Sequence, residues 1–241
     1  MNTEIEKLTQ ILRDSNNIVF FGGAGCSCES GIPDFRSASG LWNEKLKINL
    51  TPEQLVSHTM FMKYPKEFFE FYRDKLIYPD AKPNAAHIAL AKLEEMGKLK
   101  AVVTQNIDGL HQKAGSKNVL EVHGTTYKNH CIKCGKEYNA KFVFNSVGVP
   151  KCSCGGTIKP DVILYGEMLP EAYSLAVSYI YKAETLIVAG TSLTVEPACG
   201  LVKLFNGKNL IIINDTPTQY DNLATLVIYE KMENVIKEIK D

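Results

Sequence analysis

The feature that most constrains the fold is an apolar run that stops at a cluster of glycines. Residues 18–21 read Ile-Val-Phe-Phe, and β-branched and aromatic residues of this kind are typical of a buried strand. Gly22, Gly23 and Gly25 follow, and glycine lets a backbone turn sharply and approach a ligand closely. We expect a helix to start near Ser27, with unpaired N–H groups at its start that favour an anion. The sequence therefore predicts a phosphate-binding turn, although any tight strand-to-helix turn can use such glycines.

The next segment does not continue as the long helix of a standard dinucleotide-binding fold. Pro33, Asp34, Phe35 and Arg36 combine a rigid kink, a carboxylate, an aromatic ring and a guanidinium group. This composition favours a loop that covers a bound cofactor. A surface loop with a salt bridge is the alternative interpretation.

Composition excludes several classes of protein. With 241 residues, of which 45% are hydrophobic, the chain is long enough for a large globular domain with a satellite. Lys+Arg and Asp+Glu both number 27, so no overall field attracts nucleic acid or an anionic membrane. The first residues do not resemble a signal peptide, and no apolar run reaches the length of about 18 residues needed to cross a membrane. We expect a soluble, cytoplasmic protein without membrane contact.

Polar side chains follow several predicted strands. Gln105, Asn106 and Asp108 come after the apolar segment 101–104. In an open parallel sheet the carboxyl ends of the strands meet at one crevice, so these groups should face the glycine turn. Amides and a carboxylate suit recognition of a carboxamide and a ribose, while helix capping is the alternative for Asn106 or Asp108. Other polar strand ends are Thr191, Ser192, Asn214 and Asp215.

One histidine stands out from the other four. His123 ends the short predicted strand 119–122 and precedes a glycine. Its ordinary pKa near 6.5 suits abstraction of a proton from a sugar hydroxyl. Because the other histidines lack this setting, we interpret them as structural or surface residues.

Four cysteines predict a metal site. Cys131 and Cys134 are separated from Cys152 and Cys154 by 17 residues, a spacing that lets two tight turns present four thiolates to one zinc ion. Four thiolates leave no open coordination position, so the zinc should be structural. The odd total of seven cysteines and the absence of a secretion signal argue against disulfides. Lysines make this module locally basic. We interpret them as a solvated face, with nucleic-acid binding as the less favoured alternative.

These motifs, in this order, resemble those of the sirtuins, the NAD-dependent protein-lysine deacylases. The resemblance covers about residues 18–215 and includes Gly-Ala-Gly-x-Ser, Glu-Ser-Gly-Ile-Pro-Asp-Phe-Arg, Thr-Gln-Asn-Ile-Asp, His-Gly, the four cysteines, Gly-Thr-Ser and a later Asn. The departures are small. Gly22 replaces a common threonine, and Tyr165 stands where the family usually has phenylalanine. Cys26 and Cys28 flank Ser27, either as oxidation-sensitive thiols or as small residues packed against a turn.

The resemblance implies an α/β fold in which a Rossmann-like parallel-sheet domain carries a smaller zinc-ribbon and helical subdomain. We expect the NAD-binding domain to consist of residues 1–36, 84–124 and 160–241. The cofactor loop and a helical insertion should occupy 37–83, and the zinc-ribbon module 125–159.

The resemblance also implies a chemistry and a set of site residues. NAD would be a co-substrate: the acyl oxygen of a modified lysine attacks the ribose carbon, nicotinamide leaves, and the acyl group is transferred to ADP-ribose. His123, as general base, and Asn106 would be catalytic. The peptide of the partner protein would pair with the strand around 159–167, with Phe35, Ile163 and Tyr165 as substrate-binding residues. The cofactor-binding residues would be Ala24, Cys28, Phe35, Arg36, Gln105, Ile107, Asp108, His123, Thr191, Ser192, Asn214 and Asp215.

Some functional alternatives stay open at this point. One is a regulatory module that binds NAD or ADP-ribose, and another is an ADP-ribosyltransferase that uses the same cleft. A hydride-transferring oxidoreductase is disfavoured because no acidic residue follows the glycine turn at the usual distance. Sirtuins that remove succinyl or malonyl groups carry a tyrosine and an arginine three residues apart. Here Lys75 follows Tyr72, and lysine lacks the bidentate fork, so we expect neutral acyl groups, acetyl first.

Overall fold

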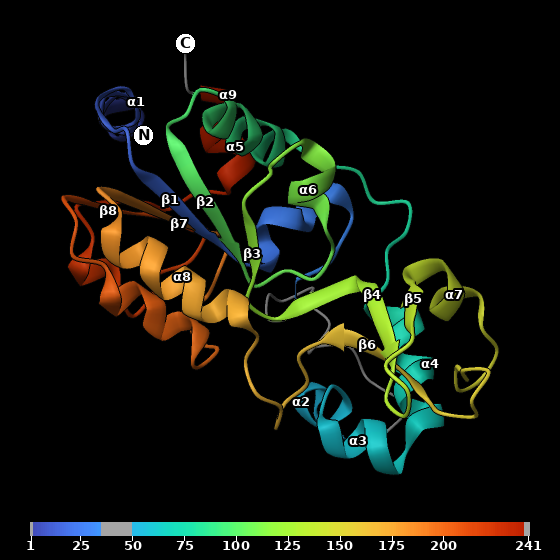
Figure 1. Ribbon diagram of the computed structural model, residues 1–241. Helices are drawn as coiled ribbons and strands as arrows, with labels where there is room; N and C mark the ends of the chain where they lie inside the picture. Colours follow the sequence, from blue (N-terminus) through green and yellow to red (C-terminus); the bar gives the residue numbers. More distant parts are fainter. Residues whose placement is uncertain (1, 35–49, 239–241) are drawn as a thin grey trace.

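A parallel sheet forms the centre of the computed structural model, which describes residues 2–34 and 50–238. The predictions for Phe35 and Arg36 lie outside the described residues. The sheet has the strand order β3-β2-β1-β7-β8-β9, and every neighbouring pair is parallel (Figure 1). The strands are β1 (Ile18–Gly22), β2 (Leu99–Thr104), β3 (Val119–Glu121), β7 (Thr185–Ala189), β8 (Asn209–Ile213) and β9 (Leu226–Ile228).

Helices cover both faces of this sheet, which explains why its central strands are apolar on both sides. All five residues of β1 are buried: Val19 and Phe21 pack on one face, and Ile18 and Phe20 on the other. Figure 1 shows α8 on the first side and α5 and α9 on the second. The predicted Rossmann-like arrangement is confirmed. The helices packed on this sheet are α1 (Asn2–Asp14), α5 (Ala85–Glu95), α8 (Glu171–Lys182), η3 (Ala198–Leu204) and α9 (Met232–Glu238).

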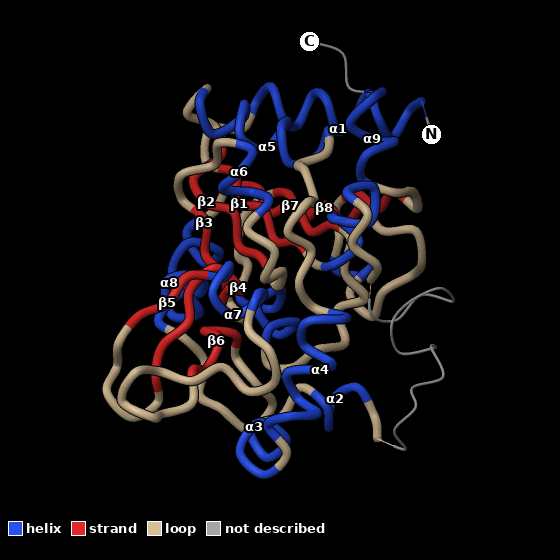
Figure 2. The backbone as a smooth tube through the Cα atoms, turned by 90° about the vertical axis from the view of Figure 1, so that its right-hand side faces the viewer, coloured by secondary structure: helices blue, strands red, loops and turns tan. Residues whose placement is uncertain are grey.

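A smaller lobe lies at the opposite end of the molecule from α1, α5 and α9 (Figure 2). Its antiparallel sheet has the order β5-β4-β6, and aromatic residues of the helices α3 and α4 pack against that sheet in one core. Phe61, Phe68, Phe69 and Tyr72 are almost fully buried there, with Phe68 and Tyr72 stacked. The elements of this lobe are α2 (Pro52–Leu55), α3 (His58–Lys63), α4 (Pro65–Lys75), β4 (Gly124–Cys131), β5 (Glu137–Asn139), α7 (Ala140–Asn145) and β6 (Ile158–Val162).

The remaining described elements are short. They are η1 (Ala24–Ser30), α6 (Leu110–Ala114) and η4 (Asp221–Leu223). The helix expected near Ser27 is therefore a 3₁₀ helix that begins at Ala24. Within the described ranges, no helix has the length and apolar character required to cross a bilayer.

Two buried histidines lie together beside β1. The ring centroids of His87 and His111 are 4.7 Å apart, and both residues are at most 1% exposed. Neither ring nitrogen of His111 has a hydrogen-bond partner among residues 2–34 and 50–238. Burial and the neighbouring charge of His87 lower the pKa of His111 to about 3, and burial also lowers the pKa of His87, against the opposing charge of Asp108. Both imidazoles are therefore neutral in the folded protein, as expected for structural histidines.

This pair predicts acid sensitivity. A histidine whose pKa is lowered by folding stabilises the protein above its unfolded pKa of about 6.5, and that contribution is lost as the pH falls. Each such histidine should cost up to about 1.4 kcal/mol of unfolding free energy per pH unit below that value. We expect His111→Phe, which removes no hydrogen bond seen in the described residues, to have nearly the wild-type unfolding free energy at pH 7.5. Between pH 6.5 and 5 its unfolding free energy should fall by less than that of the wild type. Urea unfolding at each pH measures this, and equal losses in the two proteins would contradict it.

Candidate active site

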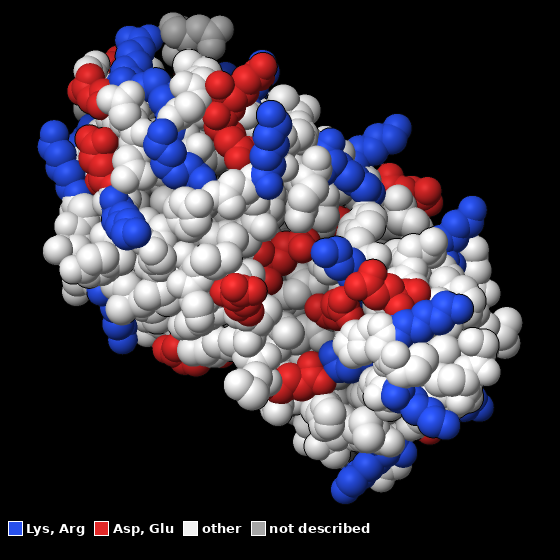
Figure 3. All heavy atoms as spheres, in the orientation of Figure 1, with Lys and Arg blue, Asp and Glu red and all other residues white. Residues whose placement is uncertain are grey.

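A pocket of about 420 Å³ is lined by residues of both lobes. Ala24 and Ser27 come from the turn after β1, and Gln105, Asn106, Ile107 and Asp108 from the segment after β2. The pocket thus lies beyond the carboxyl ends of neighbouring parallel strands, as predicted. On the face drawn in Figure 3, acidic side chains gather near the middle of the molecule, while many Lys and Arg side chains lie towards its two ends. His123, Ile163 and Tyr165 also line the pocket.

The glycine turn serves close packing. The prediction that its N–H groups are unpaired is wrong for both Gly23 and Gly25. Gly23 N–H donates to the Ala189 carbonyl (3.2 Å), and Gly25 N–H donates to the Gly190 carbonyl (2.8 Å). A Cβ atom on Gly25 would lie 2.7 Å from the Cα atom of Gly190. These glycines are needed because the turn after β1 lies directly against the turn after β7.

Gln105 offers an unused donor beside this turn. Its backbone N–H donates to the Gly22 carbonyl (2.9 Å), and its Oε1 accepts a hydrogen bond from Thr191 Oγ1 (2.8 Å). Its Nε2 is buried and has no partner within the part of the chain that the structure describes. A buried amide donor without a partner is costly, and an acceptor on a bound ligand would remove this cost. A ribose or carboxamide oxygen is such an acceptor, so this side chain fits NAD.

A hydrogen-bonded chain fixes the two other polar groups. Asn106 Nδ2 donates to Ser27 Oγ (3.0 Å), and Ser27 Oγ donates to Asp108 Oδ2 (2.7 Å). Asp108 Oδ1 also accepts from the N–H of Leu110 (2.9 Å), so this carboxylate, which precedes the N-cap Gly109, pairs with the first N–H of α6 while it faces the pocket. The capping and site interpretations are therefore compatible. Ser27 was absent from the predicted site residues, although its place in Gly-Ala-Gly-x-Ser was the available signal.

His123 is oriented by the backbone around it. It lies in the turn between β3 and β4, and its Nδ1 is 3.1 Å from the carbonyl oxygen of Gln105. A carbonyl only accepts, so Nδ1 carries the proton and Nε2 retains the lone pair of a base. Burial lowers the pKa of His123, against the raising effect of the Gln105 hydrogen bond. The neutral, basic form is thus favoured near pH 7.

The glycine after this histidine lets two strands of the small lobe, β4 and β6, approach closely. Gly124 has φ +75°, and a Cβ atom there would lie 1.9 Å from the Asp161 carbonyl oxygen of β6. Only glycine allows this approach. The carbonyl of His123 then accepts a hydrogen bond from the N–H of Ile163 (2.9 Å). The backbone of the predicted base is therefore tied directly to the predicted substrate-binding segment.

The four predicted zinc ligands form one cluster. The sulfur atoms of Cys131, Cys134, Cys152 and Cys154 lie within 4.8 Å of one another, and neighbouring pairs are 3.4–3.7 Å apart. A tetrahedron with Zn–S bonds of about 2.3 Å has S···S distances of about 3.8 Å, so the cluster fits zinc. Gly156 leaves room for it, because a Cβ atom there would lie 2.5 Å from Cys131 Sγ. Zinc here joins the two turns of the small lobe.

The sequence matches a known protein family over most of its length. The Sir2 family model matches residues 23–197, which include the glycine turn, His123 and all four clustered cysteines. The chain belongs to the Sir2 family.

Full-length relatives of this Sir2 protein share one description. A protein of Clostridium perfringens is 61% identical over 244 residues, covering 100% of both chains, and is named an NAD-dependent protein deacetylase. A protein of Clostridium acetobutylicum with the same name is 53% identical and covers 98% of each chain. A solved Sir2 structure with a p53 peptide and NAD+ has a TM-score of 0.85 and 36% identity, over 98% of this chain and 96% of that one.

The structure brings most, but not all, of the predicted site residues to the pocket. Ala24, Gln105, Asn106, Ile107, Asp108, His123, Ile163 and Tyr165 line it. Cys28, Thr191, Ser192, Asn214 and Asp215 are not among the lining residues. Thr191 contacts the site through Gln105, whereas Ser192 pairs with Thr194 and the Asn214 amide donates to Thr216. The predicted contacts of these five residues with NAD stay predictions.

The two thiols near the turn are not activated. Burial raises the pKa of Cys26 to about 12 and that of Cys28 to about 11. Cys26 Sγ donates to the Ala189 carbonyl (3.3 Å), and Cys28 Sγ donates to the Ala24 carbonyl (3.6 Å). Oxidation proceeds through the thiolate, so the structure favours packing against the turn over a redox role for both residues.

Zinc should be required for the stability of the small lobe. We expect the purified wild type to hold a single zinc ion, and Cys134→Ala to lose it together with several degrees of the unfolding midpoint, because the metal joins the two cysteine turns. Atomic absorption and thermal unfolding measure the two quantities. Cys28→Ala is the matched control, and it should retain zinc. A Cys134→Ala protein with full zinc content would contradict the assignment of this ligand.

Proposed function

We propose that this Sir2 protein removes acetyl groups from lysine side chains of other proteins and consumes NAD as it does so. The acyl oxygen attacks the ribose carbon that carries nicotinamide, nicotinamide leaves, and the acetyl group is transferred to ADP-ribose. Full-length relatives named NAD-dependent protein deacetylases support this reaction. One observation carries the proposal: His123, with its Nε2 lone pair available, lines the same pocket as Gln105, Asn106 and Asp108.

Each polar side chain of the pocket has its own chemical role in the proposed reaction. His123 Nε2 accepts a proton from a ribose hydroxyl, because its other nitrogen is held by the Gln105 carbonyl. The unpartnered Nε2 of Gln105 donates to a ribose or carboxamide oxygen. Asn106 and Asp108, linked through Ser27, are fixed before the substrate arrives, which lowers the entropic cost of catalysis.

The peptide would bind beside the segment after β6. Ile163 and Tyr165 line the pocket, and Tyr165 is 42% exposed at its edge. The N–H of Tyr165 donates to the Val56 carbonyl (3.0 Å), and the Tyr165 carbonyl accepts from the N–H of His58 (2.9 Å). Strand addition by a peptide therefore has to use other backbone groups of this segment. A solved Sir2 structure with an acetylated peptide, 36% identical and with a TM-score of 0.85, supports a peptide substrate.

We assign the protein to the cytoplasm, because all seven cysteines are free and four are arranged for a metal that needs thiolates.

Two alternative functions are a regulatory module that binds NAD or ADP-ribose, and an ADP-ribosyltransferase. The base-competent His123 favours an enzyme over a silent module. Mass spectrometry separates the two reactions, since a deacetylase removes mass from the peptide and an ADP-ribosyltransferase adds ADP-ribose to an acceptor.

Replacement of the base should stop the reaction. We expect His123→Ala to lower nicotinamide release from NAD and an acetylated peptide by about 100- to 10,000-fold, the usual contribution of a general base. NAD binding, measured by calorimetry, should survive. Because burial lowers the pKa of His123, the midpoint of the acid-side fall in wild-type kcat/KM should lie below pH 6.5, the ordinary value for histidine.

The control for this experiment is His130→Ala, which changes a histidine outside the pocket lining and should leave the rate unchanged. Nicotinamide release at the wild-type rate by His123→Ala would overturn the assignment of the base. Release that declines already above pH 7 would contradict the lowered pKa.

Acyl preference should follow from Lys75. Its side chain lines the pocket beside Phe71 and Leu76, and its Nζ is 3.5 Å from Asp74 Oδ2, so its charge is already partly compensated. We expect kcat/KM for an acetyl peptide to exceed that for a succinyl peptide by about tenfold or more, because a buried carboxylate needs a bidentate partner. Lys75→Arg should narrow this ratio. Lys66→Arg on the same helix is the control, and equal rates on both peptides would contradict the expectation.

A further inference from the structure

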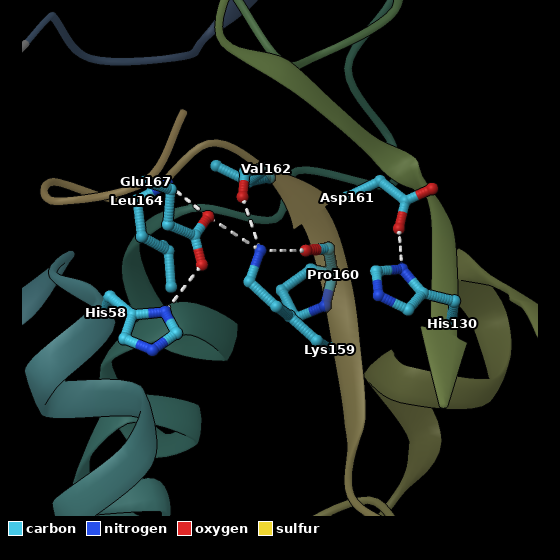
Figure 4. A network of polar contacts seen from close by, with 8 residues as sticks. All are labelled: His58, His130, Lys159, Pro160, Asp161, Val162, Leu164 and Glu167. Carbon is cyan, nitrogen blue, oxygen red and sulfur yellow. Dashed lines mark hydrogen bonds and ion pairs between the residues drawn. The ribbon is translucent and has the colours of Figure 1, made fainter. Parts of the chain in front are cut away.

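A buried ion pair closes the peptide-binding segment, defined as residues 163–167, into a loop. Lys159 Nζ and Glu167 Oε2 are 2.9 Å apart, and their side chains are only 11% and 15% exposed. Glu167 Oε2 also accepts from the N–H of Leu164 (3.0 Å), and Glu167 N–H donates to the Leu164 carbonyl (2.9 Å). Glu167, at the end of the segment, is therefore bound both to Leu164 near the start of the segment and to Lys159 of β6 (Figure 4).

Lys159 uses its hydrogen-bonding capacity on the same strand. Besides Glu167, its ammonium group donates to the carbonyls of Pro160 (3.1 Å) and Val162 (2.9 Å). An ammonium group has three donors, so Lys159 is fully satisfied. This contact fixes the end of β6 at the residue before the segment begins. Figure 4 shows the lysine directed at Glu167, apart from the contact of His130 with Asp161.

A third contact brings in the helical part of the small lobe. His58, at the start of α3, donates from Nδ1 to Glu167 Oε1 (2.9 Å), and its backbone N–H donates to the Tyr165 carbonyl (2.9 Å). Burial raises the pKa of Glu167, but the hydrogen bonds from His58, Leu164 and Lys159 outweigh it and lower the pKa overall. Glu167 is thus an ionised acceptor at neutral pH, and its carboxylate joins α3, β6 and the segment.

We propose that Lys159 and Glu167 are positioning residues that fix the peptide-binding segment 163–167 relative to His123. The proposal rests on the deacetylase function proposed above. The link to the base is the hydrogen bond from Ile163 N–H to the His123 carbonyl, which starts the segment, while the ion pair closes it. Loss of the pair lets the segment move in the peptide cleft. The glycine turn and Gln105 lie outside this network, so NAD binding stays as it was.

The test compares KM for the peptide with KM for NAD in variants of the ion pair. We expect Lys159→Met and Glu167→Gln to raise KM for an acetylated peptide by about 10- to 100-fold, because a misplacement of the order of 1 Å costs this much. KM for NAD should change less than about twofold, whereas general loosening of the fold would raise both. Direct peptide binding, measured by fluorescence anisotropy, should weaken by the same factor. In the double variant the rise should be clearly smaller than the product of the two single rises.

Three further variants complete the experiment. Lys159→Arg keeps a cation and should return peptide KM towards the wild-type value. His130→Gln changes the neighbouring contact with Asp161. Lys98→Met removes a lysine of the large lobe that also makes three hydrogen bonds, all of them to carbonyls at the end of α1. Both controls should keep peptide KM. If Lys159→Met fails to fold, Glu167→Gln and Lys159→Arg still give the comparison.

The outcomes separate the two proposals. A wild type that releases no nicotinamide would refute the proposed function, whatever the variants do. An active wild type with folded variants that keep the wild-type peptide KM would overturn the positioning role alone. Parallel increases in KM for peptide and NAD would also overturn it, because they would show a general structural effect.

Discussion

Close packing of two turns at the centre of the sheet is the constraint on which the site depends. β1 lies between β2 and β7, and the turn that follows it contacts the tips of both neighbours. Gly25 and Gly190 each lack room for a side chain, because each would meet the backbone of the other turn. The N–H groups of Gly23 and Gly25 are hydrogen-bonded to β7 and to the turn after it, so the turn after β1 forms a fixed part of the pocket wall. Ala24 and Ser27 then face the pocket from the first residues of η1.

The fold was predictable because its signals are local. The apolar strand 18–21, the polar strand ends and the cysteine spacing each depend on a few neighbouring residues, and the structure confirms the parallel sheet and the metal cluster. The pairing of the glycine amides was not predictable. It depends on Gly190, which is far along the chain, and a sequence pattern does not show which distant carbonyl will reach a turn.

The same distinction applies within the site. That His123 precedes a glycine can be read from the sequence, but the reason for the glycine lies in β6, whose Asp161 carbonyl would collide with any side chain there. The tautomer of His123 depends on the Gln105 carbonyl, and the bridging role of Ser27 depends on Asn106 and Asp108. Motifs therefore identify the residue types, whereas long-range backbone contacts decide which atom of each residue is available for chemistry.

The two lobes meet through the backbone around the site. His123 lies where the parallel sheet ends and β4 of the small lobe begins, and its carbonyl holds the start of the segment after β6. The other end of that segment is held by Glu167, which is bound to Lys159 of the small sheet and His58 of the helical part. Zinc ligands and packed aromatic rings share the core beneath these elements. The geometry at His123, the proposed base, is therefore determined by the large sheet on one side and by the small lobe on the other. The stability of the small lobe and the placement of the proposed peptide-binding segment are thus physically linked.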